Sequence, residues 1–486
     1  MNFAGLLFLL ITHFITGRGV IELFKVKLPL LVVISLSFIL GVGIASFFPF
    51  IMGLLHLPIS KEVLTIFILS ATVLAFIPLL KYFKGSNLKL SFQEVKFPKI
   101  YELPFLVVFC ALLSLSVWRC FYYAPNPRDM LSGPEPIAEF AVKEKTLINS
   151  IYTVDLSTTN NHLKPLYVTS LQIIYKIFVQ PFGQLWLSVL VLSFITLIIS
   201  ILKQKLHPVI VGFLMVYFFG MPEVFGYTYL MLFDYSNMIF FFCGFYFLAQ
   251  YFSDLEKKNY FLLSILFFSI ASYVRSETPI LIGMTLPLLV FYFFKDKMDM
   301  VKIAIKCALY IIFPFLVYYL AIGIFDRYYI PQHYTIAQEV NKNLSDVSTF
   351  FKILSDMSTE LIFSDNGALY YGYFIQLFLF IFIIDLIFFR KNSSREKIIA
   401  IYGICVVYIG LAALSYVFPL VDLMHTIKRG LFKMFPLMLL YFRNSGILLK
   451  LTDIINNWEY GIKEEAPRPK VVPVGNKPPV NTNKKK

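Results

Sequence analysis

Long apolar blocks recur along the chain, and they constrain its fold more than any other feature. A transmembrane helix needs about 20 mostly apolar residues to cross the hydrocarbon core of a bilayer. The blocks cover residues 3–16, 28–56, 62–80, 103–122, 183–202, 208–222, 228–252, 259–274, 277–294, 303–325, 367–389, 398–420 and 430–447. Because many of them are near this length, the pattern predicts an all-α, polytopic integral membrane protein with about 13 transmembrane helices.

The composition agrees with a membrane location and argues against other classes. Of the 486 residues, 58% are hydrophobic and 15% are charged, whereas soluble domains are about 25% charged. The net charge of +14 is explained by lysines in cytoplasmic loops, so we expect a lipid bilayer as partner and no nucleic acid. The cysteines have no CxxC or framework spacing, which favours small core residues over disulfides or a zinc site. They are Cys110, Cys120, Cys243, Cys307 and Cys405.

Lysines and arginines gather in alternate connections between the apolar blocks. The basic connections are 84–99, 203–205, 257–258, 295–297, 390–397 and the tail, and the others are 123–182, 275–277, 326–366 and 421–429. By the positive-inside rule the basic set is cytoplasmic, so the longer polar loops face the outside. Cysteine labelling at Ser132 and Ser393 tests this topology, and equal access to both from one side would contradict it.

A polar segment at residues 122–167 separates two strongly apolar stretches. A loop of this length in a compact protein is usually functional or disordered, and this one has apolar side chains that let it fold. The apolar spacing through 137–180 predicts short amphipathic helices on the outer membrane surface. The charged residues of the segment include Asp129, Glu135, Glu139, Asp155, His162 and Lys164.

Asp129 is the first candidate catalytic residue, because it follows the apolar block that ends near Tyr122 and so lies just above the outer surface. A carboxylate there can act as general base toward a hydroxyl. For the residue alone, a helix cap is the commoner role. Asp155 is the rival base, and Glu135 and Glu139 are expected to be surface charges.

Charged residues also occur within the apolar blocks. Asp234 lies inside one, where a costly buried carboxylate marks either a functional residue or a partner for a buried polar group. Arg275 and Glu277 interrupt an apolar run from 261 to 294 that is too long for one span. They form either a local ion pair at a turn or part of a site.

Lys428 and Arg429 follow His425 in the sequence HTIKRG, and they fall on the outer side against the positive-inside trend. An external anion explains their retention there, and a phosphate suits the bidentate geometry of arginine. No glycine-rich dinucleotide motif, P-loop or HExxH motif is present in the sequence, so no nucleotide site is expected.

Together these segments resemble the GT-C glycosyltransferases, polytopic enzymes that take sugars from polyprenyl-phosphate donors and include protein mannosyltransferases and lipid A aminoarabinose transferases. The shared pattern is an acid in the first long external loop, an H-x-P-P-L-Y-like step, an internal aspartate, an R-x-E turn and a late arginine. Here these are Asp129, the step His162-Leu163-Lys164-Pro165-Leu166-Tyr167, Asp234, Arg275-Ser276-Glu277 and Lys428-Arg429. The resemblance spans roughly residues 103–447.

The resemblance implies a glycosyltransferase of the bacterial cytoplasmic (inner) membrane, with its site facing the periplasm. Asp129 would deprotonate the hydroxyl of a glycan, lipid or protein acceptor. Lys428, Arg429 and Arg275 would hold the leaving phosphate of the polyprenyl-phosphate sugar donor. The other expected substrate-binding residues are His162, Lys164, Tyr167, Asp234, Glu277 and His425.

The resemblance also implies a division of the chain. Residues 1–102 form an extra N-terminal transmembrane module, since about three apolar blocks precede the one that leads into the first external loop. Residues 103–450 form a GT-C-like catalytic core with external loops 123–182 and 326–366. The tail at 451–486 is expected to be cytoplasmic and mostly disordered, because it is rich in proline, lysine and asparagine.

The chain departs from the family at Met130, where a second acid is often found, so whether Asp155 completes the site stays open. The family varies in its use of a divalent metal, so no metal ligand is assigned and a metal stays open as a cofactor. The alternatives are a polysaccharide polymerase or ligase, which usually concentrates Arg and His in its external loop, and a lipid-linked sugar transporter or flippase, with charges near the bilayer midplane.

Overall fold

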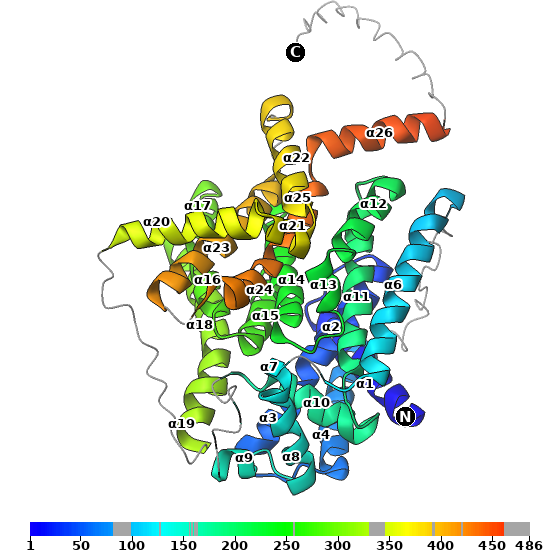
Figure 1. Cartoon of the computed structure of the whole chain (residues 1–486), viewed down its shortest axis with the longest axis vertical. Coiled ribbons are helices and arrows are strands. Elements are labelled where there is room, and N and C mark those ends of the chain that lie inside the picture. The colour runs from blue at the N-terminus through cyan, green and yellow to red at the C-terminus, as the bar shows by residue number, and fades with distance from the viewer. Residues whose placement is uncertain are drawn as a thin grey trace, which may run out of the picture.

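A computed structural model describes residues 1–80, 99–125, 128–154, 156, 159, 164–255, 258–329, 346–390, 394–418 and 421–460. All regular secondary structure in these residues is helical, which confirms the predicted all-α class (Figure 1). The tail expected to be disordered lies outside the described residues beyond position 460.

The helices of the N-terminal half are α1 (Phe3–Leu23), α2 (Leu30–Ala45), α3 (Phe47–Leu54), α4 (Lys61–Phe76), α6 (Leu103–Tyr122), α7 (Arg128–Leu131), α8 (Pro134–Glu144), α9 (Ser150–Thr153), α10 (Tyr167–Phe178), α11 (Leu185–Leu202), α12 (Pro208–Phe219), α13 (Pro222–Gly226) and α14 (Phe233–Ser253). Those of the C-terminal half are α15 (Lys258–Val274), α16 (Thr278–Gly283), α17 (Leu286–Lys295), α18 (Met300–Tyr318), α19 (Phe325–Tyr329), α20 (Val347–Asp356), α21 (Asp365–Tyr371), α22 (Phe374–Phe388), α23 (Arg395–Val417), α24 (Lys428–Gly430), α25 (Met434–Phe442) and α26 (Gly446–Tyr460). Short 3-10 or π-helical segments extend or link them: η1 (Ile77–Leu79), η3 (Ile100–Glu102), η5 (Tyr319–Ile324), η6 (Met357–Ile362), η7 (Leu423–Ile427) and η8 (Leu431–Lys433).

Every apolar block of the sequence contains a helix. Within the described residues, eight helical stretches are long and apolar enough to cross a membrane. They are Phe3–Leu23, Leu30–Leu54, Lys61–Leu79, Ile100–Tyr122, Leu185–Leu202, Thr278–Lys295, Met300–Tyr329 and Arg395–Val417. The pair α21 and α22, bent by 94°, adds a ninth if it is one span. The chain is therefore a multi-pass membrane protein, and the larger count of about 13 spans stays a prediction.

Helix α14 runs through the centre of the molecule, where it packs against α11, α15, α23 and α25. Its 21 residues extend about 30 Å at 1.5 Å per residue, which is near the thickness of a bilayer core. Asp234 lies in its first turn. Near its other end, Gln250 donates a hydrogen bond of 3.0 Å to Glu396. Charged residues thus lie at both ends of α14, with Asp234 at one end and Glu396 at the other.

Several of the basic connections meet at the C-terminal end of α14. The Nζ of Lys205 and the Nη1 of Arg443 lie 3.2 and 2.7 Å from a Glu396 carboxylate oxygen. The guanidinium of Arg395 pairs with Asp296 at 2.7 Å. These contacts bring together connections that the sequence pattern assigned to one side of the membrane, while the assignment of that side to the cytoplasm stays a prediction.

The segment from α7 to α10 folds below the central helices, opposite α26 (Figure 1). Helix α8 is amphipathic and buries Ile137, Ala138 and Ala141. Helix α10 differs, because nearly all of its side chains, polar ones included, are buried in the protein. The short helices predicted for this segment are therefore present, although α10 packs inside the protein on nearly all sides, and their position on the membrane surface stays a prediction.

Internal polar contacts explain why α10 is buried. Gln172 donates to Glu135 at 2.7 Å and accepts a bond of 3.0 Å from the Trp186 indole. The buried Lys176 pairs with Glu135 at 2.6 Å and with Glu139 at 3.0 Å. Because a buried polar group is tolerated when its bonds are satisfied, the helix needs no solvent-facing side. Glu135 is consequently a structural partner and not the expected surface charge.

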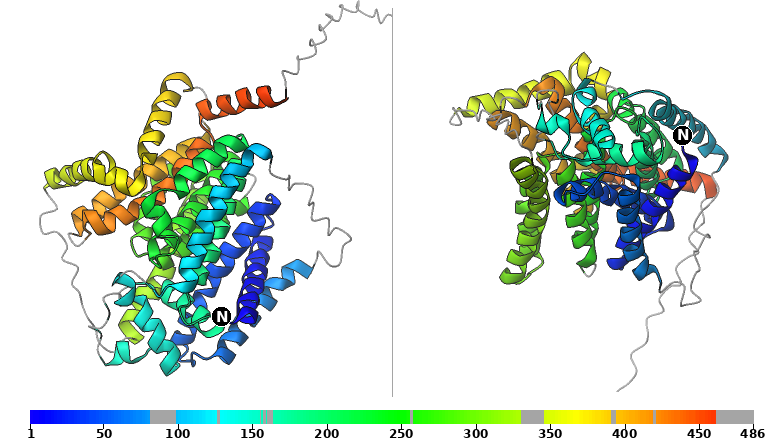
Figure 2. Two further views of the ribbon diagram at one scale, coloured as in Figure 1. Left: turned by 45° about the vertical axis from the view of Figure 1, so that its right-hand side comes forward. Right: turned by 90° about the horizontal axis from the view of Figure 1, so that it is seen from below.

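The N-terminal helices pack closely against one another and against the later helices, as Figure 2 shows for the blue and green ribbons. A Cβ on Gly17 of α1 would lie 1.8 Å from the Ser37 carbonyl oxygen, and one on Gly41 of α2 would lie 2.0 Å from the His13 carbonyl oxygen. Glycine therefore permits the α1–α2 contact. Helix α2 also packs along α11.

Candidate functional site

Charged side chains from seven separate segments meet at the N-terminal end of α14. We call this group the charged cluster. Its members are Asp129, Lys164, Glu223, Asp234, Arg275, Glu277, Lys428, Arg429 and Lys433. They come from α7, the approach to α10, α13, α14, the α15–α16 turn, α24 and η8.

Asp129 and Arg429 form the outer ion pair of the cluster, at 2.6 Å between Oδ2 and Nη1. The Asp129 side chain is 39% exposed. Burial alone raises the pKa of Asp129, but the hydrogen bond and charge of Arg429 outweigh it, so the pKa lies below its ordinary value. The carboxylate is therefore ionised at neutral pH and able to accept a proton. The Nε of Arg429 is buried and has no hydrogen-bond partner among the described residues.

A second, buried group of ion pairs lies behind the first. Arg275 Nη1 is 3.3 Å from Asp234 Oδ1, and its Nε is 2.9 Å from Glu277 Oε1. Lys433 Nζ is 3.2 Å from the same Glu277 oxygen. Asp234 and Lys433 are each 1% exposed. Burial raises the pKa of Glu277, yet the charges of Arg275 and Lys433 lower it to about 2. Two carboxylates and two cations thus keep this group neutral.

Lys428 is neutralised by an acid that the sequence patterns did not single out. Its ammonium forms an ion pair with Glu223 at the start of α13 and lies 4.0 Å from the centre of the Tyr370 ring. The hydroxyl of Tyr371 donates a 2.6 Å bond to the Lys428 carbonyl. Lys428 is thus held in place by side chains from α13 and α21.

Lys164 lies among the other charges of the cluster, with its ammonium 5.4 Å from the centre of the Phe233 ring. Burial lowers the pKa of Lys164 to about 8, and the charge of Arg275 adds to this effect. The carboxylates of Asp234 and Asp129 act in the opposite sense. Lys164 therefore loses its proton at a lower pH than an ordinary lysine.

Two further candidates, His425 and Tyr167, lie away from the centre of the cluster. His425 is 73% exposed and pairs with Asp422 at 3.0 Å, so it sits at the rim. Tyr167 is buried in an aromatic core with its ring edge-on to Trp186 and Tyr273, and no contact with the cluster is seen for its hydroxyl among the described residues. Asp155 and His162 lie outside the described residues.

Two cluster residues, Glu223 and Lys433, were missed from the sequence. Lys433 lies inside the apolar block 430–447, and the rule that singled out Asp234, an ionisable residue in an apolar block, applies equally to it. Glu223 follows the block 208–222, and no comparable pattern marked it. Within the described parts of the chain, no three His, Cys, Asp or Glu side chains form a group that could hold a metal ion.

Fold and site together define a multi-pass, all-helical membrane protein with a charged cluster at one end of its central helix. No family model, no curated protein and no solved structure matches the chain. A function for the protein therefore depends on the chemistry of the charged cluster.

Proposed function

We propose that the protein is a GT-C type glycosyltransferase that moves a sugar from a polyprenyl-phosphate donor to a glycan, lipid or protein acceptor. The observation that carries the proposal is the pairing of an ionised, partly exposed carboxylate, Asp129, with Arg429 in a cluster that also holds Lys164, Arg275 and Lys428. This arrangement combines a base for an acceptor hydroxyl with cations for a leaving phosphate.

The proposed reaction is a direct, inverting displacement. Asp129 takes the proton of the acceptor hydroxyl while the oxygen of that hydroxyl bonds to the anomeric carbon of the sugar. The bond from that carbon to the phosphate oxygen breaks, and polyprenyl phosphate leaves with one more negative charge. Arg429 keeps Asp129 ionised through Nη1, and the positive charge of its guanidinium stabilises the leaving phosphate. Lys428 and Arg275, each paired with a carboxylate, are the other cations proposed to face the phosphate.

The proposal also includes the location of the protein and the division of its chain. The protein would lie in the bacterial cytoplasmic membrane with about 13 spans and its charged cluster facing the periplasm. Residues 103–450 would form the catalytic core, preceded by the module at 1–102. A divalent metal stays open as a cofactor.

The position of the cluster favours transfer over transport. A transporter places its charges near the bilayer midplane, commonly on broken helices. Asp234 instead lies in the first turn of α14, which is continuous from Phe233 to Ser253. The charged groups therefore lie at one end of the central helix.

Arg429→Ala tests the proposed phosphate contact. It is expected to raise the KM for the polyprenyl-phosphate sugar and to lower turnover, by about tenfold or more in kcat/KM, because a charge-assisted contact to phosphate is lost. Transfer of radiolabelled sugar in liposomes measures both constants. The matched control is Arg327→Ala, since Arg327 is exposed and has no ion pair among the described residues. Unchanged kinetics in Arg429→Ala would mean that this arginine contacts only lipid headgroups.

Sugar transfer is expected to decline as the pH rises through about 8, because Lys164 loses its proton there. Burial is the main cause of this lowered pKa; Arg275 and Arg429 lower it further, and Asp234 and Asp129 raise it. Lys164→Arg stays protonated at this pH and should move the decline to higher pH. The exposed Lys143→Arg is the control. An identical alkaline decline in wild type and Lys164→Arg would rule out Lys164 as its source.

A further inference from the structure

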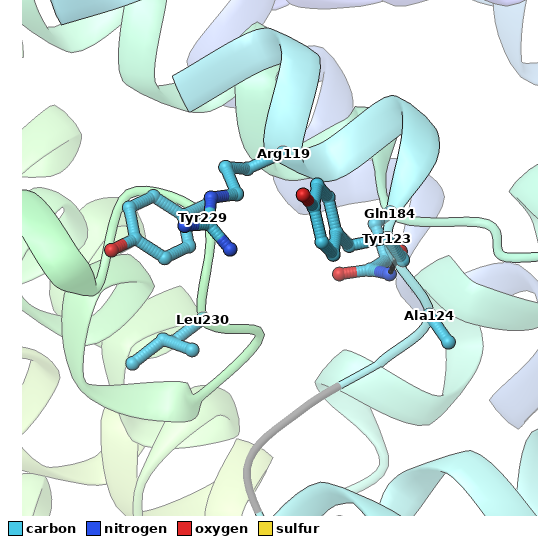
Figure 3. A pocket seen from close by; sticks show the side chains of 6 residues that line it. All are labelled: Arg119, Tyr123, Ala124, Gln184, Tyr229 and Leu230. Atoms are coloured by element: carbon cyan, nitrogen blue, oxygen red, sulfur yellow. Dashed lines mark hydrogen bonds between the residues drawn. The ribbon is translucent and has the colours of Figure 1, made fainter. Parts of the chain in front are cut away.

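A small pocket lies at the C-terminal end of α6, outside the charged cluster (Figure 3). Its volume is about 90 Å³. It is lined by Arg119, Tyr123, Ala124, Gln184, Tyr229 and Leu230. The Arg119 guanidinium carbon lies 4.6 Å from the centre of the Tyr123 ring and 5.5 Å from that of Tyr229. Stacking against two aromatic rings orients the guanidinium and leaves its N–H groups available.

Arg119 has no ion-pair or hydrogen-bond partner for its side chain in the described part of the chain. The pocket around it is nevertheless firmly built. Gln184 donates a 2.7 Å bond to the Tyr123 carbonyl, and Gln180 donates a 3.3 Å bond to the Cys120 carbonyl. These amides satisfy carbonyls that end α6, so Arg119 is not needed to cap them. A pocket with a fixed, unpaired guanidinium is suited to an anion.

The pocket lies beside a lipid-facing surface. On the outward side of α6, Leu115, Trp118 and Tyr122 are 42%, 44% and 63% exposed. Tryptophan and tyrosine at the end of an apolar helix are typical of the membrane interface, where lipid headgroups lie. An anion that reaches Arg119 from this side would come from the lipid headgroups, and phosphate is the anion that phospholipids and polyprenyl phosphates share.

The pocket is connected to the charged cluster by the chain segment that ends at Tyr229. This segment begins near Glu223 on α13, which is a member of the cluster. Tyr227 comes two residues before Tyr229 and packs edge-on against Phe432, with 4.8 Å between the ring centres. Phe432 precedes Lys433 in the sequence. Residues 223–229 thus carry both a cluster acid, Glu223, and a ring that lines the pocket, Tyr229.

We propose that the Arg119 pocket binds the phosphate of a bilayer lipid on its way to the charged cluster, and that this lipid is a polyprenyl phosphate. The choice of the polyprenyl lipid rests on the proposed function, whereas phosphate binding at Arg119 does not. Arg119 is a positioning residue in this scheme, because it holds the lipid beside the reacting groups and takes no part in the bond changes.

Native mass spectrometry of the full chain in detergent micelles tests the proposal, with polyprenyl phosphate, phosphatidylglycerol and inorganic phosphate as separate probes. Arg119→Gln is expected to weaken polyprenyl phosphate binding by about tenfold or more, because a charge-assisted contact is removed. Arg119→Lys should retain part of the affinity, since it keeps the charge and loses the planar fork. Arg327→Gln is the matched control, because Arg327 also lies near a tyrosine ring, at 5.7 Å from Tyr328, but on an exposed surface. The Arg327→Gln variant should bind polyprenyl phosphate as tightly as the wild type does.

Each result distinguishes one part of the proposal. Equal binding by wild type and Arg119→Gln, with equal melting temperatures, would overturn it. Equally tight, Arg119-dependent binding of phosphatidylglycerol would support a lipid-phosphate site and overturn the choice of a polyprenyl lipid. Inorganic phosphate that binds as tightly as the lipids would overturn the lipid source. Arg119-dependent lipid binding in a protein that transfers no sugar would refute the glycosyltransferase proposal and leave the pocket proposal standing.

Discussion

Asp129→Asn is expected to lower the turnover of sugar transfer by about 10²–10⁴-fold, the usual contribution of a general base. The acceptor hydroxyl is a poor nucleophile until it loses its proton, and Asp129 is the partly exposed carboxylate of the charged cluster. Asparagine keeps the shape of the side chain and can still accept the hydrogen bond from Arg429. It cannot take a proton, so the variant should fold and bind donor while reacting slowly.

The pH dependence gives the test a second readout. Because Arg429 holds the pKa of Asp129 below its ordinary value, the carboxylate is active at neutral pH, and activity is lost as the pH falls through that lowered pKa. Arg429→Ala removes the hydrogen bond and should move this acid limb to higher pH. If the loss of activity at low pH falls at the same pH in Arg429→Ala as in the wild type, a group other than Asp129 causes it.

Two control variants identify the base. Glu139→Gln alters a carboxylate that pairs with Lys176 and Lys143 outside the charged cluster, so it should leave turnover unchanged. Asp155→Asn tests the rival base. If Asp129→Asn retains near-wild-type turnover at normal expression while Asp155→Asn is inactive, Asp155 is the base. If both variants stay active, the proposed role of this loop is wrong.

Arg275→Ala is expected to destabilise the fold by about 3–5 kcal/mol, the cost of removing one partner from a buried ion pair. Arg275 is 12% exposed and contacts both Asp234 and Glu277. Without it, Asp234 keeps no ion pair among the described residues, and Glu277 keeps only Lys433 at 3.2 Å. An uncompensated carboxylate in a low-dielectric interior is costly. The melting temperature and the monodisperse yield in detergent measure the loss.

A compensating substitution separates charge from packing. Asp234→Asn combined with Arg275→Ala removes the excess buried negative charge, so the double variant should be more stable than Arg275→Ala alone. Arg327→Ala is again the control, because it shortens an exposed arginine and should change stability by less than about 0.5 kcal/mol. Wild-type stability in Arg275→Ala would show that the buried ion pairs contribute nothing to the fold.

The helices of this protein follow from local sequence. A run of apolar residues favours the bilayer interior whatever the rest of the chain does, and in that environment the backbone must pair its own polar groups as a helix. Every apolar block therefore corresponds to a helix, even the short blocks that form α12 and α15. The same reasoning is incomplete for α10, which is buried on nearly all sides. An apolar stripe predicts one buried face, but it does not reveal that Glu135 and Trp186 satisfy Gln172 from the other side.

The candidate charged residues were also visible in the sequence, because each one breaks a rule of composition. Asp234 lies in an apolar block, and Arg429 lies in a connection that the positive-inside rule assigns to the outer side, where basic residues are unusual. The sequence could not show which of them meet. Arg429 is 300 positions from Asp129, Lys428 is 205 from Glu223, and Lys433 is 156 from Glu277. At such separations a pairing depends on how helices pack.

The sequence by itself determined the membrane class, the helices and the residues whose charges need an explanation, because transfer free energy is a sum over neighbouring residues. Only the tertiary structure decided that α7, α13, α14 and α24 bring their charges to one place, where Glu223 and Lys433 complete the charged cluster. It also decided that Arg119 faces a pocket with no acid beside it in the described residues. An ion pair forms where the packing of whole helices places two side chains within about 4 Å, and no local pattern in the chain encodes that distance.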